Sequence, residues 1–409
     1  MTARVVAAPW VLLGAPPAGS AAPGEARALR DGAVVLEGSR ILAVGPRAEV
    51  EARHGAAVEE DAVLLPALVN AHLHLELSHL AGRVPGGGGL APWVLRLVAE
   101  RARAREGAAA EGMARGVEAL EAAGVAAVGE VSNTLASLAP LGWAGLAGTV
   151  FHEVFGFSEP RAEEALRAAR EARATATTGP VSLAVALSPH AVYSTHPATL
   201  ERLLRQGPAS IHLAEDPAER LFASRGEGPL ADIARQLGAS DADLAPRGRS
   251  AVAAVAPHLG RRSLAVHGVD LDGQDLDDLR RSGATLVLCP RSNLHIGGRL
   301  PDLPRLLAAG IPLAVGTDSL ASSPSLSPLE ELAALRRAFP RVAAARLLPL
   351  AWNGAAVGEP GLGRIVPGSA PGLLAAPLLR ERPEDPFEWL LAAGRRPSWM
   401  ARHRPEGHP

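Results

Sequence analysis

Short apolar segments of strand length alternate with amphipathic segments along most of the chain. From about residue 64 onward, the apolar runs are followed by stretches rich in Ala, Leu, Arg and Glu with helical spacing of the apolar positions. Strands that are apolar on both faces are typical of parallel sheets covered by helices. The predicted strands are 67–75, 125–131, 145–155, 181–187, 210–214, 263–269, 285–289 and 312–317, and the predicted helices include 92–105, 161–173, 197–206, 229–237 and 301–309.

This alternation predicts an α/β fold with a (β/α)8 barrel over residues 64–357, because eight strand–helix units over roughly 290 residues match the usual size of that barrel. A doubly wound open sheet is the alternative, but no Gly-x-Gly-x-x-Gly motif follows the first strand. Residues 1–63 consist of short strands and turns, and residues 358–409 are rich in Pro and Gly. We therefore expect a small β-sandwich domain built from both termini, with the apolar run 5–15 as a strand rather than a signal peptide.

Composition narrows the range of functions. The 409 residues are 47% hydrophobic and carry a net charge of −2, which is typical of a globular protein. No basic tract suggests nucleic acid or an anionic membrane as a partner, and no apolar run reaches the ~18 residues of a membrane span, so a cytoplasmic location is expected. All 41 basic residues are arginine. The absence of lysine excludes Schiff-base chemistry and any metal bridge built on a modified lysine.

Polar residues occur where several predicted strands end. The first strand ends in His72-Leu73-His74, and alternation places both histidines on one side of it. The fifth strand carries His212, the sixth ends in His267 and the eighth is followed by Asp318. Strand ends at the carboxyl side of a barrel converge on one mouth. Three histidines and a carboxylate from three strands indicate a site for one divalent metal ion, with room left for water.

This ordered series resembles the amidohydrolase superfamily, in particular its branch of mononuclear aminohydrolases and chlorohydrolases. The motifs that carry the resemblance are Asn70-Ala71-His72-Leu73-His74, His212-x-x-Glu215, His267-Gly268, Cys289-Pro290-x-Ser292-Asn293 and Gly316-Thr317-Asp318. The resemblance implies that His72, His74, His212 and Asp318 hold one zinc or ferrous ion. It also implies that Glu215 shuttles a proton to a ring nitrogen of the substrate, that His267 orients the attacking water, and that Asp318 accepts a proton from it.

The loop after the first strand resembles the aminodeoxyfutalosine deaminases of menaquinone biosynthesis, over Leu75-Glu76-Leu77-Ser78-His79 and on to Trp93. That resemblance implies a nucleoside-like small-molecule substrate with an adenine-type ring and a carboxyphenyl group. Candidate substrate contacts are Glu76 and His190 for the sugar, Arg83 and Arg291 for the substrate carboxylate, and Trp93 for stacking on an aromatic ring. Glu76 could equally support a metal histidine, the arginines could be surface residues, and Trp93 could pack in a helix interface.

Two other features and several alternatives stay open. Phe151-His152-Glu153 on the third strand is interpreted as packing or as support for a metal ligand. The stretch 367–372 lacks the Ala-Asp pair usual where this superfamily returns to its small domain.

The same metal set would serve deamination of S-adenosylhomocysteine, methylthioadenosine or guanine, or dechlorination of a triazine-like ring. A barrel that binds without turnover is the alternative of another class, and homodimers are common among such relatives.

Overall fold

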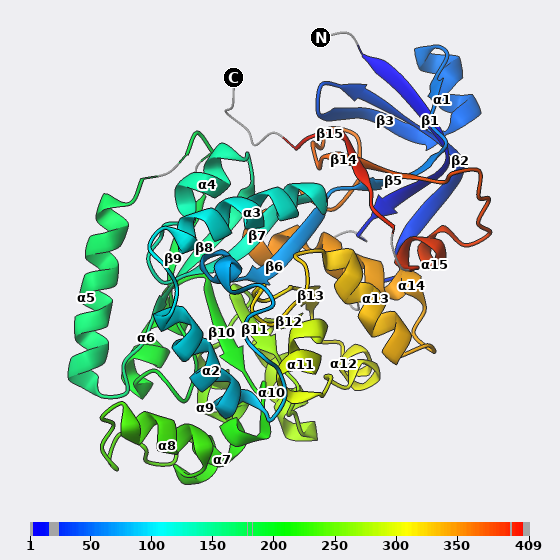
Figure 1. The fold of residues 1–409 in the computed structure, drawn as a ribbon. Helices are drawn as coiled ribbons and strands as arrows, with labels where there is room; N and C mark the ends of the chain where they lie inside the picture. The colour runs from blue at the N-terminus through cyan, green and yellow to red at the C-terminus, as the bar shows by residue number, and fades with distance from the viewer. Residues whose placement is uncertain (1–2, 16–23, 178, 182, 393–394, 404–409) are drawn as a thin grey trace.

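The computed structural model describes residues 3–15, 24–177, 179–181, 183–392 and 395–403. The chain has an α/β fold, in which most of the helices alternate along the sequence with eight parallel strands. Strands from both termini form a separate mixed sheet beside them (Figure 1). The chain leaves the mixed sheet after β5 and returns to it at β14. All eight parallel strands therefore lie between these two strands in the sequence.

The eight parallel strands form two four-stranded sheets, β6-β7-β8-β9 and β10-β11-β12-β13. Isolated parallel bridges join the two sheets at both ends, from Ala191 to His212 and from Leu73 to Asp318. All eight predicted strands are confirmed, although most are shorter than the apolar runs suggested. The strands are β6 (Leu68–Leu73), β7 (Val125–Ser132), β8 (Ala147–Val154), β9 (Ala184–Pro189), β10 (Ala209–Leu213), β11 (Ser263–His267), β12 (Thr285–Leu288) and β13 (Leu313–Val315).

Helices follow most of these strands, and local sequence signals set their ends. In α10, Asp272 and Asp275 form a capping box, and Gly283 ends the helix in the left-handed conformation. The helices are α2 (Leu90–Ala102), α3 (Ala108–Ala122), α4 (Leu138–Trp143), α5 (Glu159–Thr175), α6 (Pro197–Gln206), α7 (Pro217–Arg225), α8 (Pro229–Gln236), α9 (Ala251–Val255), α10 (Gly273–Ser282), α11 (Pro290–Gly297), α12 (Leu303–Ala309), α13 (Pro328–Ala338) and α14 (Ala344–Leu347). Short 3-10 helices are η1 (Leu75–Leu80), η2 (Ala256–His258), η3 (Leu348–Trp352) and η4 (Gly354–Val357).

The mixed sheet joins the two ends of the chain. Its strand order is β15-β14-β5-β1-β2-β3, with β4 paired to β1, and β14 runs antiparallel to β5. The predicted strand at 5–15 is confirmed as β1. The described strands of both termini thus belong to one hydrogen-bonded sheet, and the expected sandwich form stays a prediction. The elements are β1 (Arg4–Gly14), β2 (Arg27–Glu37), β3 (Arg40–Pro46), α1 (Arg47–His54), β4 (Val58–Glu59), β5 (Ala62–Pro66), β14 (Leu373–Pro377), α15 (Pro386–Leu391) and β15 (Ser398–Ala401).

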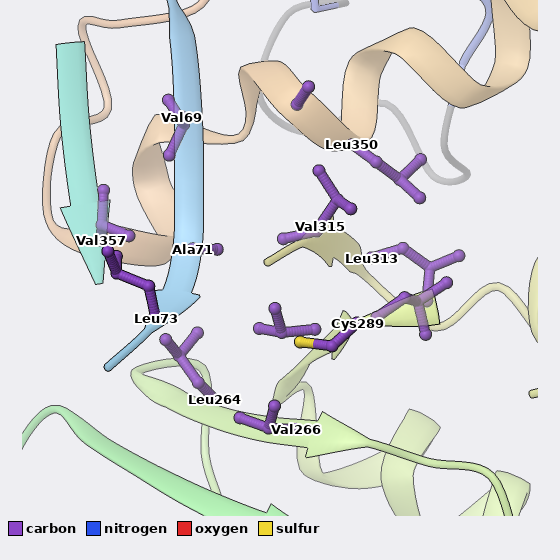
Figure 2. Close-up of a cluster of buried hydrophobic side chains, with 14 of the residues drawn as sticks. Val69, Ala71, Leu73, Leu264, Val266, Cys289, Leu313, Val315, Leu350 and Val357 are labelled. Atoms are coloured by element: carbon purple, nitrogen blue, oxygen red, sulfur yellow. The ribbon is translucent and has the colours of Figure 1, made fainter. Parts of the chain in front are cut away.

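The largest hydrophobic core is centred on the parallel strands and extends into the mixed sheet through Leu65 of β5 and Leu374 of β14. Figure 2 shows part of it, where aliphatic side chains of β6, β11 and β13 gather with Cys289 and with Leu350 and Val357. Burial of this apolar surface supplies the main driving force for folding and fixes the strand ends relative to one another. Within the described ranges, no helix has the length and apolar character needed to cross a bilayer.

Candidate metal and active site

Four histidine rings from three strands gather at the carboxyl ends of the parallel strands. His72 lies in β6 and His74 directly follows it, His212 lies in β10, and His267 ends β11. The centroid of the His72 ring lies 4.9 Å from that of His74, 5.0 Å from that of His212 and 6.0 Å from that of His267. Nε2 of His74 is 3.1 Å from Nε2 of His212. The structure therefore brings together every histidine that the sequence placed in the metal set.

Asp318 adds a carboxylate to this cluster. Its Oδ1 lies 3.5 Å from Nε2 of His74, while Oδ2 accepts hydrogen bonds from Ser292 Oγ at 2.6 Å and Ser322 Oγ at 2.9 Å. The serines hold one oxygen and leave the other facing the histidines. Asp318 and His267 both adopt left-handed backbone angles, with φ of 56° and 83°. Such conformations cost a non-glycine residue about 1–2 kcal/mol, a kind of strain that concentrates at functional sites.

Glu215 lies beside His267 on the edge of the cluster. Its Oε2 is 3.6 Å from Nε2 of His267, and its side chain is only 6% exposed. On the other side of the ring, the amide nitrogen of Asn293 lies 3.0 Å from Nδ1 of His267. With that nitrogen donating to Nδ1, the neutral ring carries its proton on Nε2, which faces Glu215. Asn293 belongs to a motif noted in the sequence, but its partner could not be inferred there.

Burial and charge set the protonation states. Burial lowers the pKa of His72 well below its usual range, that of His74 to about 4 and that of His267 to about 3. Burial, followed by the charge of Asp318, raises the pKa of Glu215 well above the ordinary glutamate value. Burial alone would raise the pKa of Asp318, but His74 and His267 outweigh it and lower the pKa. These shifts favour neutral imidazoles for these three histidines and an ionised Asp318 at neutral pH, and they make Glu215 hold its proton more strongly than an exposed glutamate does.

The donor atoms fit a divalent metal ion. Neither ring nitrogen of His72, nor Nε2 of His267, has a hydrogen-bond partner among the described residues, although all three atoms are buried. Unpaired buried polar atoms are costly, so such a group needs a reason to persist. Ligand atoms of His72, His74 and Asp318 lie within 4.8 Å of one another, as do those of His72, His212 and His267. Neutral imidazoles with a carboxylate are a suitable set of ligands for zinc or ferrous iron.

His190 lies next to the cluster, as a substrate contact would. Its ring centroid is 4.8 Å from that of His212, and its Nδ1 is 2.6 Å from Ser194 Oγ. On another side it stacks on Phe155, with ring centroids 4.5 Å apart. Phe155 directly follows β8 and is 40% exposed, which is unusual for a large aromatic side chain. The pair thus presents an aromatic surface beside the metal cluster.

Glu76 is already engaged by the loop after β7. Its Oε1 accepts hydrogen bonds from the hydroxyl groups of Ser132 and Thr134 and from the Thr134 N–H, and its Oε2 accepts one from the Asn133 N–H. The carboxylate therefore fixes this loop, and none of these hydrogen bonds is to a metal histidine. A contact of Glu76 with a ribose stays a prediction.

The two arginines proposed for a substrate carboxylate have protein partners. Arg291 is 11% exposed at its side chain, and its Nε donates to Glu331 at 2.7 Å. Its other nitrogens bind Glu330 and Ser325. Arg83 is about half-exposed and lies 3.4 Å from Glu100. Their role with substrate stays a prediction.

Trp93 is buried in α2 within a second hydrophobic cluster. Leu80, Tyr193 and Phe222 belong to the same cluster, which matches the packing alternative for Trp93. The indole nitrogen has no hydrogen-bond partner among the residues that the structure describes. Stacking of Trp93 on a substrate ring stays a prediction.

Three buried carboxylates, Glu130, Glu153 and Glu219, bind or lie beside groups of the site, and only Glu153 was noted in the sequence. Glu153 Oε1 lies 3.5 Å from Nδ1 of His212, in keeping with the open interpretation of that segment. Both oxygens of Glu130 accept the N–H that follows His74, each at 3.1 Å. Glu219 accepts the N–H of Glu215. The available signal for Glu130 and Glu153 was a carboxylate inside an otherwise apolar strand, because a charge is rarely buried there without a partner.

Comparison with known proteins identifies relatives across almost the whole chain. One relative is the aminodeoxyfutalosine deaminase of Deinococcus radiodurans, which is 31% identical over 382 residues, covering 88% of this chain and 86% of the relative. Another is a 5-methylthioadenosine/S-adenosylhomocysteine deaminase of Nitratidesulfovibrio vulgaris, 30% identical over 380 residues, covering 86% of this chain and 81% of the relative.

Solved structures share the fold. The Helicobacter pylori aminofutalosine deaminase in complex with methylthio-coformycin has a TM-score of 0.81 at 22% identity, covering 96% of this chain and 97% of that one. An adenosine deaminase from Xanthomonas campestris with bound zinc has a TM-score of 0.75 at 24% identity, covering 98% and 94%.

Family models also match this chain. A model described as imidazolonepropionase-like composite domain, bacteria, matches residues 32–57. The model described as amidohydrolase family matches residues 63–369, which include every residue of the histidine and carboxylate cluster. Because this match spans most of the chain and the Deinococcus relative aligns along nearly its full length, the chain belongs to the amidohydrolase family.

Proposed function

We propose that this chain is a metal-dependent hydrolytic deaminase of an adenine-type nucleoside, converting 6-amino-6-deoxyfutalosine to futalosine and ammonia. The observation that carries the reaction type is the buried acid Glu215, 3.6 Å from His267 and next to a cluster of buried histidines. The substrate is supported by the names of the Deinococcus and Helicobacter relatives. A place in menaquinone biosynthesis, a cytoplasmic location and a homodimer stay predictions.

We also infer that the two parallel sheets close into one (β/α)8 barrel. The bridges Ala191–His212 and Leu73–Asp318 link each edge of one sheet to an edge of the other, as closure requires. Solved structures with TM-scores of 0.81 and 0.75 support the same fold. In such barrels the catalytic groups lie at the carboxyl ends of the strands, where this cluster is found.

His72, His74, His212 and Asp318 would hold one divalent ion, zinc or iron. When bound, such an ion makes water nucleophilic at neutral pH. His212 keeps Nε2 free for this purpose, because its Nδ1 lies 3.1 Å from the carbonyl oxygen of His190 and donates there. A hydrogen bond of this kind fixes the tautomer and orientation of a metal-binding histidine.

Glu215 supplies the proton that the reaction needs. Protonating a ring nitrogen of the adenine makes the neighbouring amino-bearing carbon open to attack by water. A carboxyl group with a raised pKa holds a proton that it can deliver, and burial raises the pKa of Glu215 well above the ordinary glutamate value. His267, with its proton on Nε2, orients the water by donating a hydrogen bond, and ionised Asp318 accepts a proton from it. The proton on Asp318 then passes to the amino group, which leaves as ammonia, and the hydroxyl proton of the adduct returns to Glu215, so the ring carbon keeps a carbonyl oxygen.

Methylthioadenosine or S-adenosylhomocysteine is the second candidate substrate, because the Nitratidesulfovibrio relative is named for these nucleosides. The residues that would contact the end of the substrate away from the adenine ring bear on this choice. Phe155 and His190 offer an aromatic surface beside the cluster, which suits an aryl group. By contrast, both arginines proposed to meet a carboxylate already have acidic partners.

The test is ammonia release by the metal-loaded protein from aminodeoxyfutalosine, S-adenosylhomocysteine, methylthioadenosine, adenosine, guanine and cytosine. The highest kcat/KM with aminodeoxyfutalosine is expected. Preference for another member of the panel would keep the reaction type and overturn the substrate. No release from any member by protein with bound metal would overturn deamination and favour dechlorination or a non-catalytic barrel.

A further inference from the structure

A buried carboxylate outside the proposed catalytic set fastens the backbone that carries Glu215. Glu219 lies in the first turn of α7 and is 1% exposed. Its Oε1 accepts a hydrogen bond from the N–H of Glu215 at 2.7 Å, and its Oε2 accepts one from the N–H of Ala214 at 3.0 Å. The two carboxylate oxygens of Glu219 therefore each accept a hydrogen bond from one of the two residues that directly follow β10, Ala214 and Glu215.

The hydrogen bonds of Glu219 differ from those that a residue at its helical position usually makes. The N-cap of α7 is Asp216, so Glu219 occupies the third helical position, from which a capping-box carboxylate reaches back to the N-cap N–H. Helix α10 shows that arrangement, since Asp275 accepts the N–H of Asp272 at 3.1 Å. In α7 the hydrogen bonds reach further back, to the two residues that precede the N-cap. Glu219 thus holds the end of strand β10 rather than only the end of its own helix.

The backbone that Glu219 holds is strained and fixed from its other side as well. Ala214 has a left-handed φ of 54°, a conformation that is unfavourable for a residue with a Cβ. Its carbonyl oxygen accepts the N–H groups of Val269 at 2.7 Å and Asp270 at 2.9 Å, which lie just after His267. The turn at Ala214 therefore joins the chain that carries Glu215 to the chain that carries His267, and it needs hydrogen bonds on both peptide groups to persist.

We propose that Glu219 is a positioning residue, which holds the left-handed turn at Ala214 and thereby aims the carboxyl group of Glu215 at the reacting ring. This inference rests on the proposed function, because it takes Glu215 as the proton donor. Glu219 has no hydrogen bond to a histidine of the cluster, so its removal should disturb proton transfer and spare the metal. A purely structural role would instead lower stability without a selective effect on turnover.

The first experiment measures amide hydrogen exchange at Ala214 and Glu215 in the wild type, in Glu219→Gln and in Glu388→Gln. The last variant is a matched control, because Glu388 also occupies the third position of its helix, α15, and accepts a backbone N–H from another element, that of Ala344 at 3.1 Å. Exchange at the two amides should be about fivefold faster or more in Glu219→Gln. It should stay at the wild-type rate in the control, even though that variant is less stable. Equal exchange in the wild type and Glu219→Gln would overturn the inference.

The second experiment measures kcat, KM and metal content with the preferred nucleoside. In Glu219→Gln, kcat should fall about tenfold or more, with KM and metal content unchanged, because a small misplacement of a catalytic group is costly. Adding Glu219→Gln to a Glu215→Gln variant should cause little further loss, since the two residues act as one unit. Independent, multiplicative losses would overturn the inference. Should Glu219→Gln not fold, Glu219→Asp tests the same point, because its shorter carboxylate cannot reach both N–H groups.

The two experiments separate the inference from the proposed function. If the wild type releases no ammonia from any nucleoside, the proposed function fails, and the exchange experiment still decides whether Glu219 holds the turn. If the wild type is active and the kcat of Glu219→Gln matches that of the control at equal folded fraction, the proposed function stands and the positioning role is overturned.

Discussion

Replacing Glu215 by glutamine tests the reaction chemistry most directly. Glutamine has nearly the same size and can fill the buried position, where the side chain of Glu215 is 6% exposed. It cannot transfer a proton. Loss of a positioned general acid typically lowers the rate by about 10²- to 10⁴-fold, which corresponds to about 3–5 kcal/mol of transition-state stabilisation. We expect a fall in kcat within that range and little change in KM.

The structure also predicts that this variant keeps its metal. Glu215 lies 3.6 Å from His267 and within 4.8 Å of Asp318, but it is not itself one of the four proposed ligands. Ammonia release from the preferred nucleoside gives kcat and KM, and elemental analysis gives the metal content of the same sample. Glu227→Gln is the matched control, because Glu227 is an exposed carboxylate in the loop after α7 and should leave both quantities unchanged.

Turnover of Glu215→Gln within about threefold of the wild type would refute the reasoning, because a proton donor of this kind contributes at least about 10²-fold. Loss of metal together with activity would show that metal binding needs Glu215, and it would refute the assignment of Glu215 as an acid that is not a ligand. A raised KM at normal kcat would instead show that Glu215 only binds the substrate.

Four further predictions follow from the same geometry. His72→Ala should lose bound metal, since both nitrogens of this buried ring lack another partner, and full occupancy by elemental analysis would contradict its role as a ligand. Arg291→Gln should lower the thermal midpoint and leave KM unchanged, because its partners are Glu330 and Glu331; a raised KM at normal stability would favour the predicted substrate contact instead. Phe155→Ala should raise KM for an aryl-bearing nucleoside by a factor of about 2 to 12, the equivalent of one aromatic stacking contact, and an unchanged KM would exclude that contact. Leu264→Ala should lower the free energy of unfolding in urea by about 2–5 kcal/mol, and a loss below about 1 kcal/mol would show that this part of the core repacks.

The sequence predicted the strands of the parallel part and which histidines and which aspartate lie together at their ends. Strands buried on both faces give continuous apolar runs, so a polar residue at the end of such a run stands out, as His72, His212 and His267 do. Because parallel strands in a barrel end at one mouth, residues more than two hundred positions apart could be assigned to one site. The expected β-sandwich is a weaker inference, since the strands of both termini appear in one mixed sheet.

The tertiary structure alone decided what each polar group contacts. No spacing in the chain could show that Glu76 accepts hydrogen bonds from the loop after β7, that Arg291 pairs with Glu331, or that Phe155 stacks on His190. Side chains at strand ends can turn toward the mouth, a helix or a neighbouring loop, and the choice depends on backbone angles such as the left-handed φ of Ala214. The sequence thus determined where the strands lie and which of them end in polar residues, because hydrophobic periodicity is a local property. The positions of Glu219, Glu130 and Glu153 behind it depended on contacts that form only when the strands are assembled.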